Sequence, residues 1–220
     1  MNLKSRPIYF AVALLAVSLF GCRSSQDEAI GKDRVERPSS VPGWKEIKTS
    51  GFALSFPGDW SAMDITSNEL SKRAEKTYGG NSQFEDKRKA VEAGAKRGDI
   101  KLMVRSDAVT PSGNHSVGDV IVTSSGNQTL DNQAQATVRQ LMKTALPGTD
   151  VPKVDVDTPA GRFVKITHFY LSSKSIPYAS FLYLTIKGDK AYVVGFTTSK
   201  DSAPEVERIA DQSIKTFHFE

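Results

Sequence analysis

Residues Phe181–Phe196 read FLYLTIKGDKAYVVGF, and this stretch determines the predicted fold class. The dipeptide Gly188-Asp189 is a turn signal that joins two strands directly in a hairpin. Both flanking runs are apolar at consecutive positions and not only at alternate ones, which indicates that both faces of the strands are covered. A connection this short makes the two strands antiparallel neighbours. The stretch therefore predicts an antiparallel sheet with a layer packed on each face.

Further strands precede this hairpin. Residues 153–157 and 162–171 are joined by the sequence TPAG, which suits a type I turn with proline at its second position. Upstream, residues 100–105 and 117–123 have the apolar pattern of strands, and a loop rich in turn-forming residues lies between them. Because the connections between the strand-like runs of residues 153–198 are short, we expect these runs to be antiparallel neighbours.

Two amphipathic helices are predicted to cover the sheet. Thr129 can cap a helix over residues 129–145, in which apolar residues recur at helical spacing. The sequence Ser-Ala-Pro-Glu at 202–205 has the pattern of a capping box and predicts a helix over residues 204–215. Each helix has one apolar stripe suited to packing on a sheet. The predicted fold class is α+β, an α/β/α sandwich in which a central antiparallel sheet has helices on both faces.

A second, shorter hairpin is predicted near the start of the folded region. Residues 44–47 and 52–56 are short strand-like runs, and proline in the sequence Pro-Gly-Asp at 57–59 ends the second one. We expect Trp60, which follows, to pack over the edge of the sheet. The alternative for Trp44 or Trp60 is stacking on a ligand.

The segment Gly51–Trp60, GFALSFPGDW, resembles the opening strand and the Phe-Pro-x-x-Trp turn of PsbP-like domains. This group includes bacterial envelope lipoproteins of the DcrB and LpqN kind. The order of the later elements and the closing Ser-Ile-Lys-x-Phe at 213–217 also resemble the group, so the resemblance covers about residues 44–219. It implies an antiparallel sheet with helices on both faces. It implies no catalytic residue, because the known members act mostly as binding or accessory proteins.

Two charged helices are predicted between the hairpin and the main strands, over residues 68–76 and 82–97. Their basic side chains could form a patch for anionic lipid or an acidic partner. However, residues 61–106 have a net charge of only +3, so solvated helix faces are the favoured interpretation. No aromatic residues are interleaved with the bases, and we predict no nucleic-acid binding.

The N-terminal segment Met1–Cys22, MNLKSRPIYFAVALLAVSLFGC, has the pattern of a secretory signal peptide. Lys4 and Arg6 form a short basic start, and Pro7–Phe20 is an uncharged apolar run. This run is shorter than the roughly 20 residues that a membrane span needs. Cleavage is therefore favoured over a transmembrane anchor.

The last four residues, Leu19-Phe20-Gly21-Cys22, resemble a bacterial lipobox, in which the cysteine becomes lipidated. Cys22 is the only cysteine of the chain, so an exported protein could form no internal disulfide. We predict that acyl chains such as palmitate are attached to Cys22 and hold the protein on a membrane. The alternative is a free thiol at the end of a transmembrane helix.

The predicted organisation has three parts: a lipoprotein signal peptide at 1–21, a flexible tether at 22–42 and a single globular domain at 43–220. The tether is rich in charged residues, serine and proline, and has too few apolar residues to form a core. Removal of the signal peptide lowers the net charge from +4 to +2, which gives no reason to expect nucleic acid as a partner.

The histidines are the residues that an enzyme could use. His115 lies in the predicted loop at 106–116, and an exposed loop histidine is favoured there over a ligand or a general base. We expect His168, in a strand beside Phe169 and Tyr170, to be a half-buried structural residue. No known catalytic or phosphate-binding motif is present in the sequence.

The acids Asp155 and Asp157 share one face of a predicted strand, which suggests a calcium site. An EF-type loop would need further oxygen ligands and a glycine where Ala160 stands, so exposed acids beside a turn are favoured. We predict no metal site and no cofactor.

The sequence as a whole predicts a lipid-anchored protein of the bacterial cell envelope. We expect it to act non-catalytically, as a protein-binding or accessory module, with an envelope protein as partner. The alternatives are a small-ligand-binding envelope protein and a hydrolase whose site is assembled from loops around His115 or His168. Arg23 after the lipidated cysteine is not the aspartate that retains many lipoproteins at the inner membrane, so a periplasm-facing outer-membrane location is expected.

Overall fold

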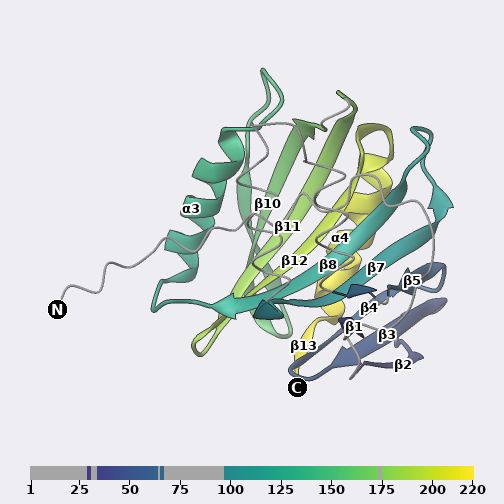
Figure 1. Cartoon of the computed structure of the whole chain (residues 1–220). Coiled ribbons are helices and arrows are strands. Elements are labelled where there is room, and N and C mark those ends of the chain that lie inside the picture. The colour runs from purple at the N-terminus through teal and green to yellow at the C-terminus, as the bar shows by residue number, and fades with distance from the viewer. Residues whose placement is uncertain (1–28, 31–33, 64, 67–96, 173–174) are drawn as a thin grey trace.

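The computed structural model describes residues 29–30, 34–63, 65–66, 97–172 and 175–220, and its largest element is a seven-stranded sheet (Figure 1). The strands of this sheet are β5 (Trp60–Ala62), β7 (Ile100–Val109), β8 (His115–Ser124), β9 (Lys153–Thr158), β10 (Gly161–Leu171), β11 (Pro177–Lys187) and β12 (Lys190–Ser199). Their order is β5-β7-β8-β12-β11-β10-β9, and every neighbouring pair is antiparallel. The antiparallel sheet predicted from the sequence is confirmed.

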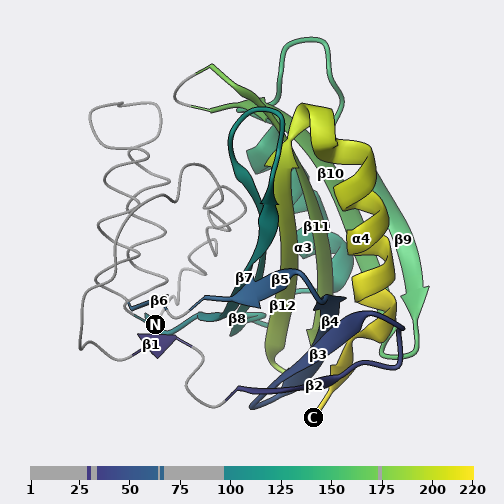
Figure 2. The ribbon, with the colours of Figure 1, turned by 90° about the vertical axis from the view of Figure 1, so that its right-hand side faces the viewer.

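A smaller sheet lies beside the C-terminal end of the last helix (Figure 2). Its strands are β2 (Val35–Pro38), β3 (Trp44–Thr49), β4 (Phe52–Pro57) and β13 (His218–Phe219), in the order β13-β4-β3-β2. The hairpin of β3 and β4 is the one predicted before Trp60. A short third pair joins β1 (Ala29–Ile30) to β6 (Ile65–Thr66).

The structure describes two α-helices, α3 (Leu130–Met142) and α4 (Ala203–Thr216), and both were predicted. The side chain of Thr129 accepts a hydrogen bond from the backbone N–H of Asn132, so this residue caps α3 as expected. Ser202 precedes α4, but its side chain makes no capping hydrogen bond. The capping box predicted at 202–205 is wrong in this respect, because a 3-10 turn over Lys200–Ser202 leads into the helix.

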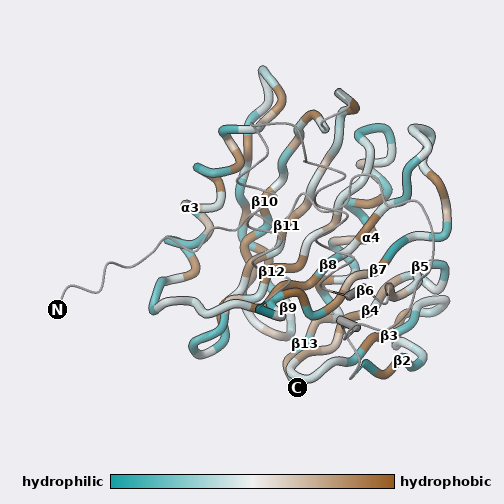
Figure 3. Tube along the Cα trace, viewed as in Figure 1, coloured by the Kyte–Doolittle hydropathy of each residue, from teal (hydrophilic) through white to brown (hydrophobic). Residues whose placement is uncertain are grey.

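Two apolar clusters fill the interior, one on each face of the large sheet. Phe163 belongs to one cluster and its neighbour Val164 to the other, because successive residues of a strand point to opposite faces. Figure 3 shows the apolar residues concentrated along the central strands. We call the two surfaces the α3-side face and the α4-side face, after the helix whose residues join each cluster.

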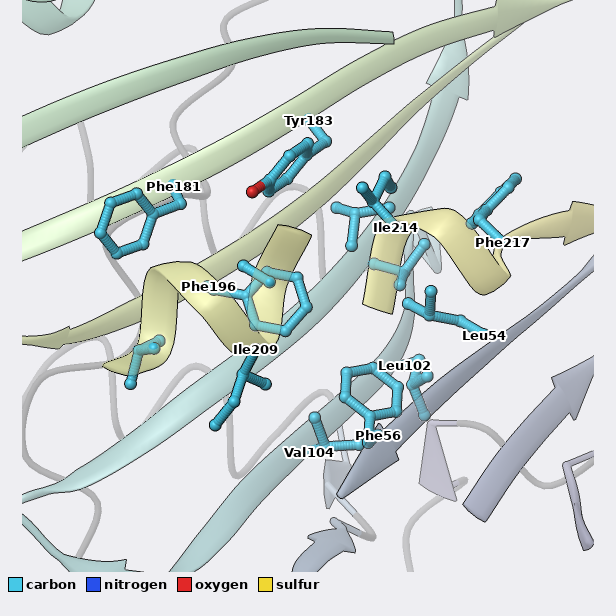
Figure 4. Packing of buried hydrophobic residues seen from close by; sticks show 14 of the residues in the cluster. Leu54, Phe56, Leu102, Val104, Phe181, Tyr183, Phe196, Ile209, Ile214 and Phe217 are labelled. Atoms are coloured by element: carbon cyan, nitrogen blue, oxygen red, sulfur yellow. The ribbon is translucent and has the colours of Figure 1, made fainter. Parts of the chain in front are cut away.

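The α4-side face has an aromatic core (Figure 4). Phe56, Phe196 and Trp60 pack together with ring centroids 6.0 to 6.2 Å apart. Trp60 is therefore a core residue. The α+β class is confirmed. The finer description as an α/β/α sandwich remains a prediction, because residues of β3 and β4 share the covering of this face with α4.

The folded region begins earlier than predicted. Val35–Pro38 pairs with β3, so part of the segment expected to be a flexible tether at 22–42 is an edge strand. All four residues of β2 are exposed, and the strand is held by backbone pairing and by the ion pair of Arg37 with Glu46. Such a strand has no apolar pattern, which is why composition alone predicted a tether.

The hairpin of β7 and β8 is also longer than expected. His115 is the first residue of β8 and not part of a loop, and β7 continues to Val109. The predicted loop at 106–116 is therefore reduced to a short turn. The predicted helix at 68–76, nearly all of the one at 82–97, and the signal peptide with Cys22 lie outside the described residues.

The contact between α4 and the large sheet includes a lysine that is buried under the helix. Lys165 Nζ lies 2.7 Å from Glu207 Oε1 and 2.8 Å from Asp211 Oδ1, and the side chain of Lys165 is only 9% exposed. The hydroxyl of Tyr183 donates to Asp211 at 2.5 Å. Burial, with the hydrogen bond to Asp211, raises the pKa of Tyr183, so this hydroxyl stays protonated. The network fastens α4 to β10 and β11.

Removal of the two acids should destabilise the protein more than removal of the lysine. Glu207→Gln with Asp211→Asn leaves a buried cation without a counter-charge, and we expect a loss of about 3 kcal/mol in the free energy of unfolding. Lys165→Met leaves two half-exposed acids that water can solvate, and should cost roughly 1 kcal/mol. Urea unfolding measures both, with Arg208→Gln on the exposed face of α4 as the control. Equal losses in the two variants would contradict this account.

Candidate functional site

Polar residues cross the α3-side face of the large sheet in one row. The register places Arg105 opposite Val117, Val117 opposite Thr197, Thr197 opposite Ser180, and Ser180 opposite His168. Arg105 shares a face with Met103, and His168 with Ile166, and both apolar residues belong to the α3-side cluster. We call Arg105, Thr197, Ser180 and His168 the polar row. It spans the middle five strands of the sheet.

The residues at the centre and at one end of the polar row make specific contacts with neighbouring side chains. The hydroxyls of Ser180 and Thr197 form a hydrogen bond of 2.9 Å. His168 is fully buried, and its ring stacks on Tyr170 with centroids 5.0 Å apart and planes 11° apart. Tyr170 in turn stacks on Tyr178. His168 is thus packed in the interior, as a more deeply buried residue than the sequence indicated.

Asp119 lies beside the polar row, two residues along β8 from Val117. Its side chain faces the same cluster, between Met103 on β7 and Gly195 on β12, and the residue is 5% exposed. Burial raises the pKa of Asp119 to about 8. At neutral pH this residue is therefore a neutral carboxylic acid, which can donate a hydrogen bond as well as accept one.

Gly195 makes room for this acid. A Cβ atom at position 195 would lie 2.7 Å from Asp119 Oδ1 and 3.3 Å from its Cγ. Real Cβ atoms do not approach other atoms so closely, so the carboxyl group occupies the space that a side chain at 195 would need. The carboxyl group of Asp119 therefore points toward β12 and lies above Gly195.

Several buried polar atoms of the α3-side face have no hydrogen-bond partner. In the described part of the chain these include Asp119 Oδ2, Arg105 Nε, Thr123 Oγ1 and the Tyr178 hydroxyl. All four residues lie on the α3-side face by strand alternation. Each such atom costs about 1–3 kcal/mol when it is left unsatisfied, so native proteins normally supply a partner. Their collection on one face marks it as the candidate site.

The residues singled out from the sequence are placed differently. His115 Nδ1 lies 2.8 Å from the carbonyl oxygen of Ser106 at the other strand of its hairpin. Asp155 binds Arg162 Nη2 at 2.9 Å, and the same nitrogen binds Asp131 of α3 at 2.7 Å. Arg162 holds the pKa of Asp131 below its usual value. Neither His115 nor Asp155 lies in the polar row.

No group of three or more His, Cys, Asp or Glu side chains within the described ranges is arranged to hold a metal ion. The described helices are too short or too polar to cross a membrane.

Sequence reasoning missed Asp119 and the polar row. One signal was present: Asp119 is the only charged residue in the strand VGDVIVT, between apolar neighbours. The row itself joins residues from strands that are far apart in the chain, and only the register brings Arg105 and His168 into one line.

Comparison with known proteins gives matches among solved structures only; no family model and no curated protein matches the chain. LpqN of Mycobacterium tuberculosis, described as involved in cell envelope biogenesis, is 10% identical with a TM-score of 0.49, over 84% of this chain and 90% of that one. CyanoP, the cyanobacterial PsbP of Synechocystis, is 12% identical with a TM-score of 0.48, over 92% and 99% of the two chains. A Pseudomonas aeruginosa protein of unknown function is 14% identical with a TM-score of 0.45, over 52% and 78%.

LpqN and CyanoP are of the kinds to which the sequence resemblance pointed. With TM-scores below 0.5, the likeness carries no conclusion about what this chain binds or does.

The protonated state of Asp119 should make stability fall as pH rises. The folded chain keeps this proton up to about pH 8, whereas an ordinary Asp loses it near 3.8. Between these values the unfolded chain binds fewer protons, so the free energy of unfolding falls by up to about 1.4 kcal/mol per pH unit. Urea unfolding from pH 4 to pH 8 should show this fall in the wild type and not in Asp119→Asn, which is always neutral. The exposed control Asp189→Asn should retain it, and a wild-type slope in Asp119→Asn would refute the assignment.

Gly195→Ala should destabilise the protein because the new methyl group collides with the Asp119 carboxyl group. We expect a loss of about 1–3 kcal/mol in the free energy of unfolding. In the background of Asp119→Ala the same change should cost much less, because the colliding atoms are gone. A double-mutant cycle by urea unfolding measures this coupling. Additive losses would show that the contact is not responsible.

Proposed function

We propose that this protein is a lipid-anchored protein of the bacterial cell envelope, and that its domain acts non-catalytically as a protein-binding or accessory module. The observation that carries the proposal is the leader ending in Leu19-Phe20-Gly21-Cys22, which contains the only cysteine of the chain. Two or more acyl chains on Cys22 give a stable anchor, since each buried methylene contributes about 0.8 kcal/mol. The expected location is the periplasm-facing outer membrane, and the expected scaffold is an α/β/α sandwich.

The position of the first strands supports a domain held close to the membrane. Only six residues separate Cys22 from Ala29, the first residue of β1. A fully extended chain spans at most about 3.6 Å per residue, so β1 would lie within roughly 25 Å of the anchor. The domain would therefore meet its partners at or near the membrane surface.

The burial of His168 supports binding over catalysis at this residue. His115 is held by a backbone carbonyl of its own hairpin, and His168 is stacked in the interior with no exposed surface. A general base must reach a proton of its substrate within hydrogen-bond distance. His168 offers no surface that a substrate could reach, which disfavours the alternative of a hydrolase built around this residue.

A second candidate function is the binding of a small ligand. It is favoured by a specific observation, the collection of buried polar atoms without partners on the α3-side face. Sites for small molecules combine apolar walls with a few placed polar groups, and Asp119 and the polar row lie among the apolar residues of the α3-side cluster.

Substitution of Cys22 tests the proposed anchoring and partner together. Wild-type protein and Cys22→Ala are expressed in the native host, crosslinked in intact cells and purified, and mass spectrometry identifies bound proteins and any acyl groups. We expect acylated Cys22 in the wild type, and loss of both the acyl chains and an envelope partner in Cys22→Ala. Cys22→Ser serves as a second variant that keeps the size of the residue.

Two results would overturn parts of the proposal. An unmodified Cys22 in mature wild-type protein would remove the lipid anchor. Acylated protein that captures no reproducible envelope protein would remove the partner-binding role and leave ligand binding as the function to pursue.

A further inference from the structure

Two of the buried polar groups without partners are diagonal neighbours on the same face. Arg105 on β7 lies opposite Val117, and Asp119 is two residues further along β8. Side chains in this relation have Cβ atoms typically about 7–8 Å apart. Long side chains at such a separation can meet, yet among the described residues Arg105 Nε and Asp119 Oδ2 each lack a hydrogen-bond partner.

The direction of the Asp119 carboxyl group explains why the two do not pair. It leans over β12, where Gly195 has no side chain, and β12 lies on the side of β8 away from β7. Met103, directly opposite Asp119 on β7, is apolar and offers no hydrogen bond. Arg105 and Asp119 therefore flank a region of the α3-side face in which both have unused hydrogen-bonding capacity.

The chemistry of the pair selects one kind of partner. A guanidinium group has only donors. A neutral carboxylic acid adds a donor in its O–H group. A ligand group that pairs with Arg105 and Asp119 at once must therefore accept hydrogen bonds. Carboxylate and phosphate oxygens match the fork of donors on arginine best. From this juxtaposition, we propose that the α3-side face binds a small molecule through a carboxylate or phosphate group held between Arg105 and Asp119.

The graded burial of the two residues fits this role. Arg105 is partly exposed. It lies on β7, and only the three-residue strand β5 separates β7 from the edge of the sheet. Asp119 is buried one strand further in. The arginine would meet the anionic group first, and the acid would then complete its coordination away from water, where hydrogen bonds are stronger. The Ser180 and Thr197 hydroxyls lie further along the same face.

This inference rests on the second candidate function given above, the binding of a small ligand. It does not rest on the lipid anchor. It predicts a property of the folded domain that acylation and an envelope partner do not change. Failure of the Cys22 experiment and failure of the present one are thus distinguishable.

Titration with simple anions tests the site. The full chain, as purified from its native host in neutral detergent micelles, is titrated at pH 6 with acetate or with inorganic phosphate, against chloride at equal ionic strength, and the thermal unfolding midpoint is followed. We expect saturable stabilisation by at least one of the two anions. Arg105→Gln should raise the half-saturating concentration about tenfold or more, because a charge-assisted hydrogen bond is lost. Arg139→Gln, on the exposed surface of α3, is the control and should titrate like the wild type.

The pH profile gives a readout that a merely structural role would not change. In the wild type, acetate affinity should fall as pH rises above about 8, because Asp119 then ionises and repels the anion. Asp119→Asn keeps a neutral donor, so its affinity should be close to the wild-type value at pH 6 and should not fall with pH. Arg105→Lys keeps the charge without the planar fork and should give an intermediate loss, which tests the site even if Arg105→Gln folds poorly.

Each outcome decides the matter. Saturation by acetate alone indicates a carboxylate ligand, and saturation by phosphate alone indicates a phosphate-bearing one. No saturation by either anion would overturn the proposal and leave ordered water as the partner of these atoms. Equal titrations of wild type, Arg105→Gln and Arg139→Gln would also overturn it, because they would show a general salt effect.

Discussion

The antiparallel pairing of β11 with β12 is the constraint on which the rest of the structure depends. It extends from Tyr178 opposite Ser199 to Lys187 opposite Lys190, around the turn at Gly188. The two strands lie at the middle of the large sheet, so each of their faces supports a different cluster. Side chains from different strands, both apolar and polar, lie in rows across the sheet only because this register is fixed. A shift by one residue would exchange the two faces completely.

The two faces of the large sheet differ in how their buried polar groups are satisfied. On the α4-side face, aromatic rings pack against one another, and the charged group of Lys165 is satisfied by Glu207 and Asp211. On the α3-side face, the central strands carry Asp119 and the polar row among aliphatic residues. A face that is used only for stability gains nothing from buried polar atoms without partners. The difference between the faces is therefore the main structural reason to connect the α3-side face with binding.

Much of the fold was predictable because local signals and long-range packing agree in it. The turn at Gly188, the cap at Thr129 and the apolar stripe of α4 each determine one element from neighbouring residues. Strand β2 was not predictable from composition, because backbone pairing and an exposed ion pair hold it, and neither produces an apolar pattern. The candidate site could not be predicted from the sequence for another reason. Arg105, Asp119 and Gly195 come together through the register of three strands, which no local pattern encodes.

The attachment of β2 also has a mechanical consequence. The chain enters the small sheet at Val35, which is opposite Lys48, and β2 is paired on one side only. Once the short pairing of β1 with β6 has opened, a pull on the chain upstream of Val35 acts on the end of β2 and separates its backbone hydrogen bonds from β3 one after another, not all at once. Since the residues of β2 are exposed, the strand can detach without opening either apolar cluster. The folded domain thus has a releasable length of chain at its N-terminal side, which can extend its reach under load while the core stays intact.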